Sequence, residues 1–301
     1  MIARLRLAAA AATAAAAAGC GLGAGPASEG TATLTVTRDY GTRRLATGRE
    51  SRPTASETVL RFLDRNTKIT TRYGGGFVES IEGVSGTEVG GRRFDWFFYV
   101  NGIESPVGAA QVRVRGGDRI WWDYRDWTDA MRVPAVIGSW PQPFAAAGRR
   151  ARVVCEAARR VCALVRSRAR WAGLRPTRAA GAPRLLVGPW GRIRRDPGAA
   201  QLDAGPGTSG VFARFAGHGG AFDLQLLDTG GGIAKGAGAA AGLLAAVREG
   251  DEPPTWLVTG GSEAGVSRAA RLLNSRDVRD RYALAATRRG PVSLPMVVGG
   301  G

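Results

Sequence analysis

The stretches "FDWFFYVNGIES" (94–105) and "GDRIWWDYRDW" (117–127) are crowded with rings, in a 301-residue chain that is only 7% aromatic. Both are typical of β-strands, because they are rich in aromatic residues and are separated from each other by glycine-containing turns. The pair Asn101-Gly102 predicts a tight hairpin turn, because both residues tolerate the positive φ angles that such a turn requires. These two stretches therefore predict a sheet with an unusual number of rings.

Alternation along a strand divides these rings between the two faces of the sheet. In the second stretch one set consists of Ile120, Trp122 and Tyr124, and the other of Trp121 and Asp123. In the first stretch the sets are Trp96, Phe98 and Val100, and Phe97 and Tyr99. We expect a helix to cover the face that carries Ile120. Rings left on the other side need a cover, which is a second domain, a partner or a ligand.

The segments around these strands predict one helix crossing one mixed sheet. Residues 31–41 alternate as a half-buried strand, and 41–50 can return as its hairpin partner. Residues 54–66 predict a helix that starts at Thr54 or Ser56 and has an apolar stripe at helical spacing. Further strands are expected at 76–84 and 109–115. The order β–β–α–β–β–β is that of a β-grasp fold, so the predicted class is α+β.

The motifs "YGGGFVESIEGV", "DWFFYVNGIESPVGAAQVRV" and "GDRIWWDYRDW" resemble a bacterial domain-of-unknown-function family related to the C-terminal β-domain of transcobalamin and gastric intrinsic factor. The resemblance covers about residues 32–130. It implies a ligand-binding β-grasp module, which in the vitamin carriers packs over one face of cobalamin. This sequence departs from the carriers because it has no large helical barrel to close over the ligand.

Candidate ligand-binding residues follow from exposed rings and glycine-rich loops. The "TRYGGGF" loop offers backbone amides and close approach beside a tyrosine. Stacking on tryptophan and tyrosine would supply affinity. The predicted ligand-binding set is Tyr73, Gly74, Gly75, Trp96, Tyr99, Asn101, Trp121 and Trp127. No metal site or cofactor is predicted, and cobalamin is considered only as a ligand.

The N-terminus has the pattern of an export signal. Arg4 and Arg6 precede an apolar run of about twelve residues, which is shorter than the roughly 20 that span a membrane. Ala17-Ala18-Gly19-Cys20 resembles the lipobox of bacterial lipoproteins, in which the cysteine becomes the lipidated first residue, although Ala17 stands where leucine is usual. The sequence thus predicts a signal peptide at 1–20, lipidation of Cys20 and a flexible tether at 21–30. The predicted location is extracytoplasmic, on the outer face of the membrane.

The second half predicts a different architecture. Residues 31–145 form the predicted β-grasp domain with its exit linker, and 146–301 alternate strands and helices as an α/β sandwich of unknown role. Helices are expected near 157–174, 237–250 and 262–274.

Cys155 and Cys162 can form a disulfide only if Cys155 ends a strand and Cys162 lies in the following helix; otherwise they are two small buried residues.

Charge points to anionic partners. The net charge is +17, and between Arg149 and Arg195 there are fourteen arginines and one acidic residue, Glu156. A general arginine bias that keeps the chain soluble would give the same totals. The stretch lacks the interleaved aromatic and basic pattern of nucleic-acid-binding modules, so no nucleic-acid partner is predicted.

Catalytic motifs are weak throughout the sequence. There is no G-x-S-x-G and no P-loop, and His218 is the only histidine. The chain is therefore predicted not to be an enzyme. The predicted function is a lipid-anchored binding protein for a small molecule, with a corrinoid as the sharpest candidate and a membrane transporter as a further partner. The alternative is an envelope module that binds a wall polymer or a protein.

Overall fold

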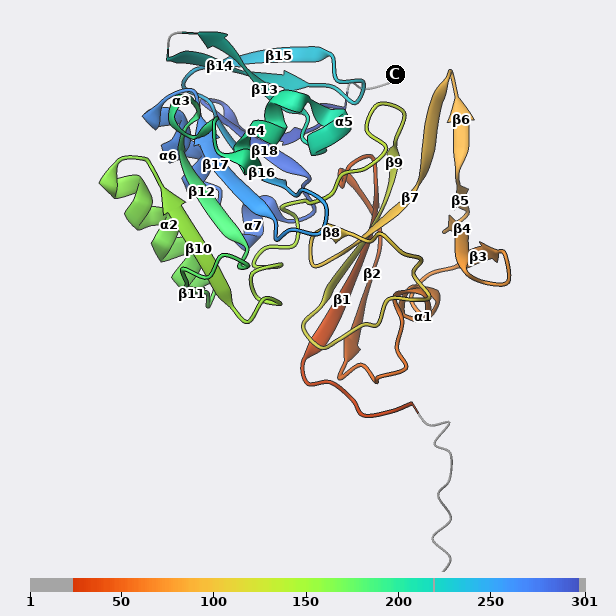
Figure 1. Ribbon diagram of the computed structural model, residues 1–301. Coiled ribbons are helices and arrows are strands. Elements are labelled where there is room, and N and C mark those ends of the chain that lie inside the picture. The colour runs from red at the N-terminus through yellow and green to blue at the C-terminus, as the bar shows by residue number, and fades with distance from the viewer. Residues whose placement is uncertain (1–23, 219, 298–301) are drawn as a thin grey trace, which may run out of the picture.

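The computed structural model describes residues 24–218 and 220–297, with the side chain of His218 left out. Within these residues the fold is mixed α+β, consisting mostly of strands with few helices, and the strands form several sheets (Figure 1). No helix in this part of the chain is long and apolar enough to cross a membrane. The predicted signal peptide and Cys20 lie outside the described residues.

The first sheet is mixed and has the strand order β2-β1-β9-β7-β6, with β8 paired to β7. Its strands are β1 (Thr31–Arg38), β2 (Arg43–Ser51), β6 (Thr87–Val89), β7 (Arg92–Val100), β8 (Ile103–Glu104) and β9 (Arg119–Asp126). β1 runs parallel to β9, and the β1–β2 and β7–β9 pairs are antiparallel. The predicted turn joins β7 to β8, with φ of 57° at Asn101 and 80° at Gly102.

One face of the first sheet packs against α1 (Val59–Asp64). Val59, Phe62 and Leu63 of this helix are buried in one cluster with Ile120, Trp122 and Tyr124, as the alternation predicted. The helix starts later than predicted, because its N-cap is Thr58, whose hydroxyl accepts a bond from the Arg61 amide (3.2 Å). Residues 54–57 instead belong to the segment that leads into the helix.

A small antiparallel sheet lies beside the first one. It consists of β3 (Ile69–Arg72), β4 (Phe77–Ile81) and β5 (Val84–Ser85). The predicted strand at 109–115 is wrong, because this segment makes only an isolated bridge between Thr58 and Arg113. Its backbone instead meets the start of α1, with Val59 N–H donating to Val112 (2.9 Å) and Leu60 N–H to Ala109 (3.1 Å).

The second half is built on a seven-stranded sheet of order β11-β10-β12-β17-β16-β18-β19. Its strands are β10 (Arg150–Cys155), β11 (Arg175–Pro176), β12 (Arg184–Pro189), β16 (Gly242–Val247), β17 (Thr255–Gly260), β18 (Ala283–Thr287) and β19 (Gly290–Leu294). A third sheet contains β13 (Ala213–His218), β14 (Ala221–Leu227) and β15 (Ile233–Gly238). The other helices are α2 (Arg159–Trp171), α3 (Trp190–Ile193), α4 (Pro197–Ala200), η1 (Gln201–Ala204), α5 (Pro206–Ser209), α6 (Glu263–Arg271) and α7 (Ser275–Val278).

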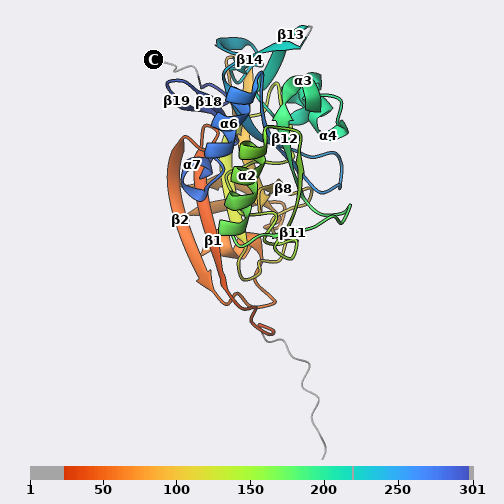
Figure 2. The same cartoon turned by 90° about the vertical axis from the view of Figure 1, so that its left-hand side faces the viewer.

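Helices and strands cover opposite faces of the seven-stranded sheet. α2 and α6 lie on one face, which is turned toward the viewer in Figure 2, and bury Val165 and Val266 there. The other face packs against the β13–β14 hairpin and the short helices. The helix predicted at 237–250 is wrong. Residues 242–247 are all buried in β16, between β17 and β18, and pairing on both sides overrides the helical preference of alanine and leucine.

The Cys155–Cys162 disulfide is confirmed. Cys155 ends β10 and Cys162 lies in the first turns of α2, with their Cα atoms 5.9 Å apart. This is the arrangement that the sequence required for a bridge at a separation of seven residues.

Removing this bridge should destabilise the second half. The double replacement Cys155→Ser, Cys162→Ala is expected to lower the free energy of unfolding by about 2–3 kcal/mol, because the bond closes a short loop in the unfolded chain. Urea unfolding with and without reductant measures this. Reductant should destabilise the parent protein and leave the double variant unchanged, and an equal midpoint for both oxidised proteins would contradict the prediction.

The segment expected to be a tether is partly attached to the first sheet. Ser28 N–H donates to the Pro53 carbonyl (2.8 Å), and the Ser28 hydroxyl accepts from the Gly116 amide (2.8 Å). Ala55 N–H donates to Pro26 (2.9 Å). Residues 24–30, which were expected to belong to the tether, are therefore held against the first sheet by hydrogen bonds.

Candidate functional site

The rings on the face of the first sheet opposite α1 are covered by the second half of the chain. Tyr99 and Trp121 are 0% and 3% exposed. The ring of Tyr282 meets both edge-on, with centroids 5.7 Å from Tyr99 and 5.2 Å from Trp121, and also packs on Tyr40 at 5.1 Å. Of the three alternatives for covering these rings, a second domain, a partner or a ligand, the structure shows the second half of the same chain.

A buried carboxylate lies beneath this cover. Asp123 is fully buried and accepts bonds from the Thr37 hydroxyl (2.5 Å), the Gly41 amide (3.0 Å) and the Tyr282 hydroxyl (2.9 Å). The Trp121 indole N–H in turn donates to Thr37 Oγ1 (2.7 Å). Burial raises the pKa of Asp123 to about 6, even though these donors favour the charged form. The polar groups buried between the first sheet and Tyr282 therefore form hydrogen bonds with one another.

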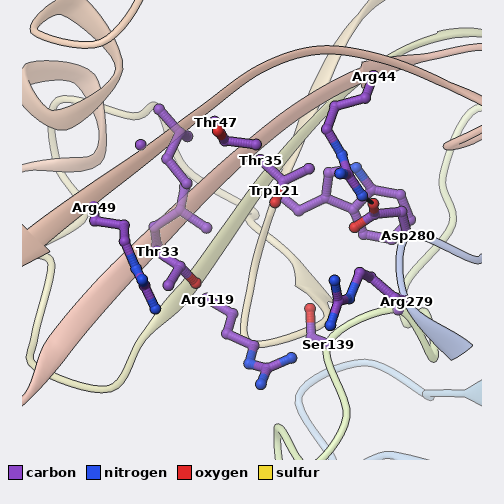
Figure 3. A pocket seen from close by; sticks show the side chains of 14 residues that line it. Thr33, Thr35, Arg44, Thr47, Arg49, Arg119, Trp121, Ser139, Arg279 and Asp280 are labelled. Carbon is purple, nitrogen blue, oxygen red and sulfur yellow. Dashed lines mark hydrogen bonds and ion pairs between the residues drawn. The ribbon is translucent and has the colours of Figure 1, made fainter. Parts of the chain in front are cut away.

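The same sheet face continues beyond Trp121 into an open groove, which we call the arginine groove (Figure 3). It has a volume of about 350 Å³. Strands β1, β2 and β9 form its floor. One part of its wall is Gly138-Ser139, and the other part is the segment 279–280 of the second half. The lining residues are Thr33, Leu34, Thr35, Arg44, Thr47, Gly48, Arg49, Arg119, Ile120, Trp121, Gly138, Ser139, Arg279 and Asp280.

Strand register places the polar floor in two rows. Thr33 pairs with Arg49 on β2 and with Arg119 on β9, so one threonine lies between two arginines. In the next row Thr35 pairs with Thr47 and Trp121. Hydroxyl and guanidinium groups from three adjacent strands thus point to the same side of the sheet.

The groove has more cations than acids. Among the described residues that line it, Asp280 is the only one with a carboxylate, and it forms an ion pair with Arg44. Arg49, Arg119 and Arg279 make no ion pair among the described residues. Partial burial and the neighbouring Arg279 lower the pKa of Arg119, and Figure 3 shows these two side chains on either side of Ser139. An anion placed among the three guanidinium groups would supply the missing countercharge.

The predicted ligand-binding residues are not gathered in one open surface. Trp96 is 8% exposed in the helix-side core and donates to the Val84 carbonyl (2.7 Å). The Asn101 amide is also structural, because it donates to Asp118 (2.7 Å) and accepts from the Arg119 amide (2.9 Å). Tyr99 and Trp121 are covered by Tyr282, and Trp121 meets the arginine groove only at its edge.

The remaining predicted residues lie at another end of the first sheet. Tyr73, Gly74 and Gly75 form the β3–β4 turn, and the Tyr73 side chain is 86% exposed. Trp127 lines a separate hollow of about 430 Å³ together with Phe77 and Arg93, whose guanidinium lies 4.0 Å from the Trp127 ring. The glycine turn and Trp127 are therefore accessible, as expected, but far fewer rings are free than the sequence suggested.

The arginines of the groove were not predicted. The sequence pattern around Arg49 and Arg119 indicates a site only weakly, because it shows no more than polar residues that share a strand face with threonines. Arg279 carries none, because it reaches the groove from the other half of the chain. No group of three or more histidine, cysteine, aspartate or glutamate side chains within the described residues is arranged to hold a metal ion.

Comparison with known families concerns the region between α1 and β9. Residues 56–126 match the family described as a domain of unknown function (DUF4430). The match includes the helix, the aromatic hairpin and Arg119, but not β1 or β2, and it covers less than half of the chain. It agrees with the domain-of-unknown-function family predicted for this region, whereas the relation to transcobalamin stays a prediction. No curated protein matches the chain.

Proposed function

We propose that this chain is a non-catalytic, extracytoplasmic binding protein that holds a small anionic ligand in the arginine groove. The observation that carries the proposal is the set of three guanidinium groups without acidic partners, around a hollow floored by threonine hydroxyls. Phosphate and carboxylate groups match guanidinium geometry and accept bonds from hydroxyls. The proposal includes no chemical step.

The β-grasp assignment of residues 31–145 belongs to the same proposal. It is supported by the strand order β2-β1-β9-β7, by the parallel β1–β9 pair and by the single helix on one face. The extracytoplasmic location is supported by the export-type N-terminus and by a disulfide, which forms and persists in oxidising compartments. Attachment through Cys20, and delivery of the ligand to a membrane transporter, are parts of the proposal that rest on the sequence pattern.

A corrinoid is a weaker candidate than a small anion. Stacking on a corrin ring needs a broad exposed aromatic surface, but Tyr99 and Trp121 lie against Tyr282 and Trp96 lies in the core beneath α1. Cobalamin contains a phosphodiester, so it belongs among the ligands to be tested against the same arginines.

Calorimetric titration tests the proposal. Protein lacking residues 1–20 is titrated with phosphate, sulfate, citrate and cobalamin. At least one anion should bind saturably, and Arg119→Gln should weaken that binding about tenfold to a hundredfold, because a charge-assisted bond contributes about 1.5–3 kcal/mol. No saturable binding of any of these ligands up to about 1 mM would overturn the proposal.

Arg115→Gln is the matched control. This arginine is exposed, lies four residues from Arg119 and does not line the groove, so the same change in net charge should leave the affinity unchanged. Equal losses in both variants would mean that only overall charge attracts the anion.

A second candidate is an envelope interaction module, which is favoured by the exposed Tyr73 and Phe77 of the β3–β4 hairpin. Their side chains are 86% and 46% exposed and their ring centroids are 6.3 Å apart. A partner protein or wall polymer would bind there through ring contacts. Co-sedimentation with purified cell walls that is lost in Tyr73→Ala, and kept in Arg119→Gln, would favour this candidate.

A further inference from the structure

A second basic surface, which shares no residue with the arginine groove, lies where α2 ends. We call it the basic end, and define it as Arg149, Arg150, Arg170, Trp171, Arg175 and Arg178. Between Asp129 and Asp196 the only acidic residue of the sequence is Glu156, which follows the other end of β10.

Backbone pairing holds the basic end together. Arg150 of β10 is the register partner of Arg175 of β11, and the Arg175 amide donates to the Arg149 carbonyl (2.7 Å). α2 closes into β11 through a tight turn, in which Gly173 N–H donates to the Arg170 carbonyl (2.9 Å). The six side chains therefore come from the paired strands β10 and β11, from Arg149 just before β10, from the last turn of α2 and from the loop that follows β11.

The basic end is open to solvent and has no internal countercharge. All five arginines are exposed, and none of them makes an ion pair among the described residues. Trp171 is 83% exposed, although its helix buries Val165 and Ala169 on the opposite side. A single exposed ring is common on protein surfaces, so the clustered arginines rather than Trp171 alone mark the basic end as an interaction surface, and Trp171 adds an amphipathic ring beside them.

The chain enters the fold at the same end of the molecule. In Figures 1 and 2, β11 lies in the lower part of the second half, and the described chain begins below it, near the start of β1. Whatever fixes the N-terminus to a surface would bring the basic end toward that surface.

We propose that the basic end docks on an anionic lipid surface. Its arginines would bind lipid phosphates, and Trp171 would lie at the boundary between headgroups and acyl chains, where an amphipathic ring is stable. Each arginine near an anionic membrane strengthens binding about fivefold. A polyanionic wall polymer would satisfy the arginines equally well but would leave the indole uncovered. The proposal is independent of the ligand in the arginine groove.

Vesicle co-sedimentation tests this proposal. The protein lacks residues 1–20, so that no acyl chain contributes, and the vesicles are phosphatidylcholine alone or an equal mixture with phosphatidylglycerol. Binding should require phosphatidylglycerol and weaken with salt. The triple variant Arg170→Gln, Arg175→Gln, Arg178→Gln should lower the partition coefficient about a hundredfold, and Trp171→Ala should lower it roughly tenfold.

The matched control is the triple variant Arg195→Gln, Arg288→Gln, Arg289→Gln. These arginines are also exposed and lie near α3 and in the β18–β19 turn, at the upper end of the molecule in Figure 2. The control should bind vesicles like the parent protein, and thermal unfolding should show that both triple variants are folded. Equal losses in the two triple variants would overturn the proposal. The proposal would also be overturned if Trp171→Ala left the partition coefficient unchanged and the protein bound to immobilised teichoic acid. That result would assign the basic end to a polymer.

Discussion

Replacing Tyr282 with alanine is expected to lower the free energy of unfolding by about 3–5 kcal/mol, the range found when a large buried aromatic side chain is truncated. The ring fills the space between Tyr40, Tyr99 and Trp121, and its hydroxyl is one of three donors to the buried carboxylate of Asp123. Both the contact and the donor are lost in the variant. Urea unfolding followed by tryptophan fluorescence measures the change.

Two further variants separate the ring from the hydroxyl. Tyr282→Phe keeps the ring and removes the donor, so it should lower stability by about 1–3 kcal/mol. Tyr73→Ala truncates an exposed tyrosine and should have little effect. If Tyr282→Ala changed stability no more than Tyr73→Ala does, Tyr282 would not be part of a packed core between the two halves.

Replacing Gly41 with alanine is expected to have the second large effect, a loss of at least about 3 kcal/mol. A Cβ at this position would lie 2.0 Å from the Asp280 carbonyl oxygen and 2.9 Å from the Trp121 ring, and the backbone has a φ of +79°. Because the obstructing atoms are backbone and a buried ring, the 280–282 segment has to move away from the first sheet. Unfolding free energy and the near-ultraviolet circular dichroism of the aromatic cluster would report this change.

Gly83→Ala is the matched control for Gly41→Ala. Gly83 has nearly the same φ, +77°, but no atom of the described part of the chain beyond its immediate neighbours lies within 4 Å of an added Cβ. It should lose only the roughly 1–2 kcal/mol that left-handed backbone costs a residue with a side chain. Equal losses in the two variants would mean that backbone conformation alone matters, and that the close approach of Asp280 does not.

Local patterns were sufficient for much of the first half. Alternation identified the face that α1 covers, since Ile120, Trp122 and Tyr124 all lie in that core. Asn101-Gly102 fixed the β7–β8 turn, because few residues other than asparagine and glycine accept its positive φ angles. Chain geometry also predicted where the two cysteines must lie if they form a disulfide, with Cys155 at the end of a strand and Cys162 in the following helix.

Local patterns failed where distant contacts compete with them. The alanines and leucines of β16 favour a helix, yet pairing with β17 and β18 makes this segment a strand that is buried at every position. Residues 109–115 alternate like a strand, but their hydrogen-bond partners are at the start of α1. In both segments the deciding partner is remote in sequence.

The sequence by itself determined which rings share a strand face, where the chain turns, and that the protein carries a large excess of arginine. Only the tertiary structure decided what covers those rings and which arginines meet. Tyr282 closes over Tyr99 and Trp121, and Arg279 joins Arg49 and Arg119, from a segment more than 150 residues further along the chain than Arg119. The reason is physical: strand alternation depends on neighbouring residues, whereas burial and charge pairing depend on surfaces that come together only when the whole chain has folded.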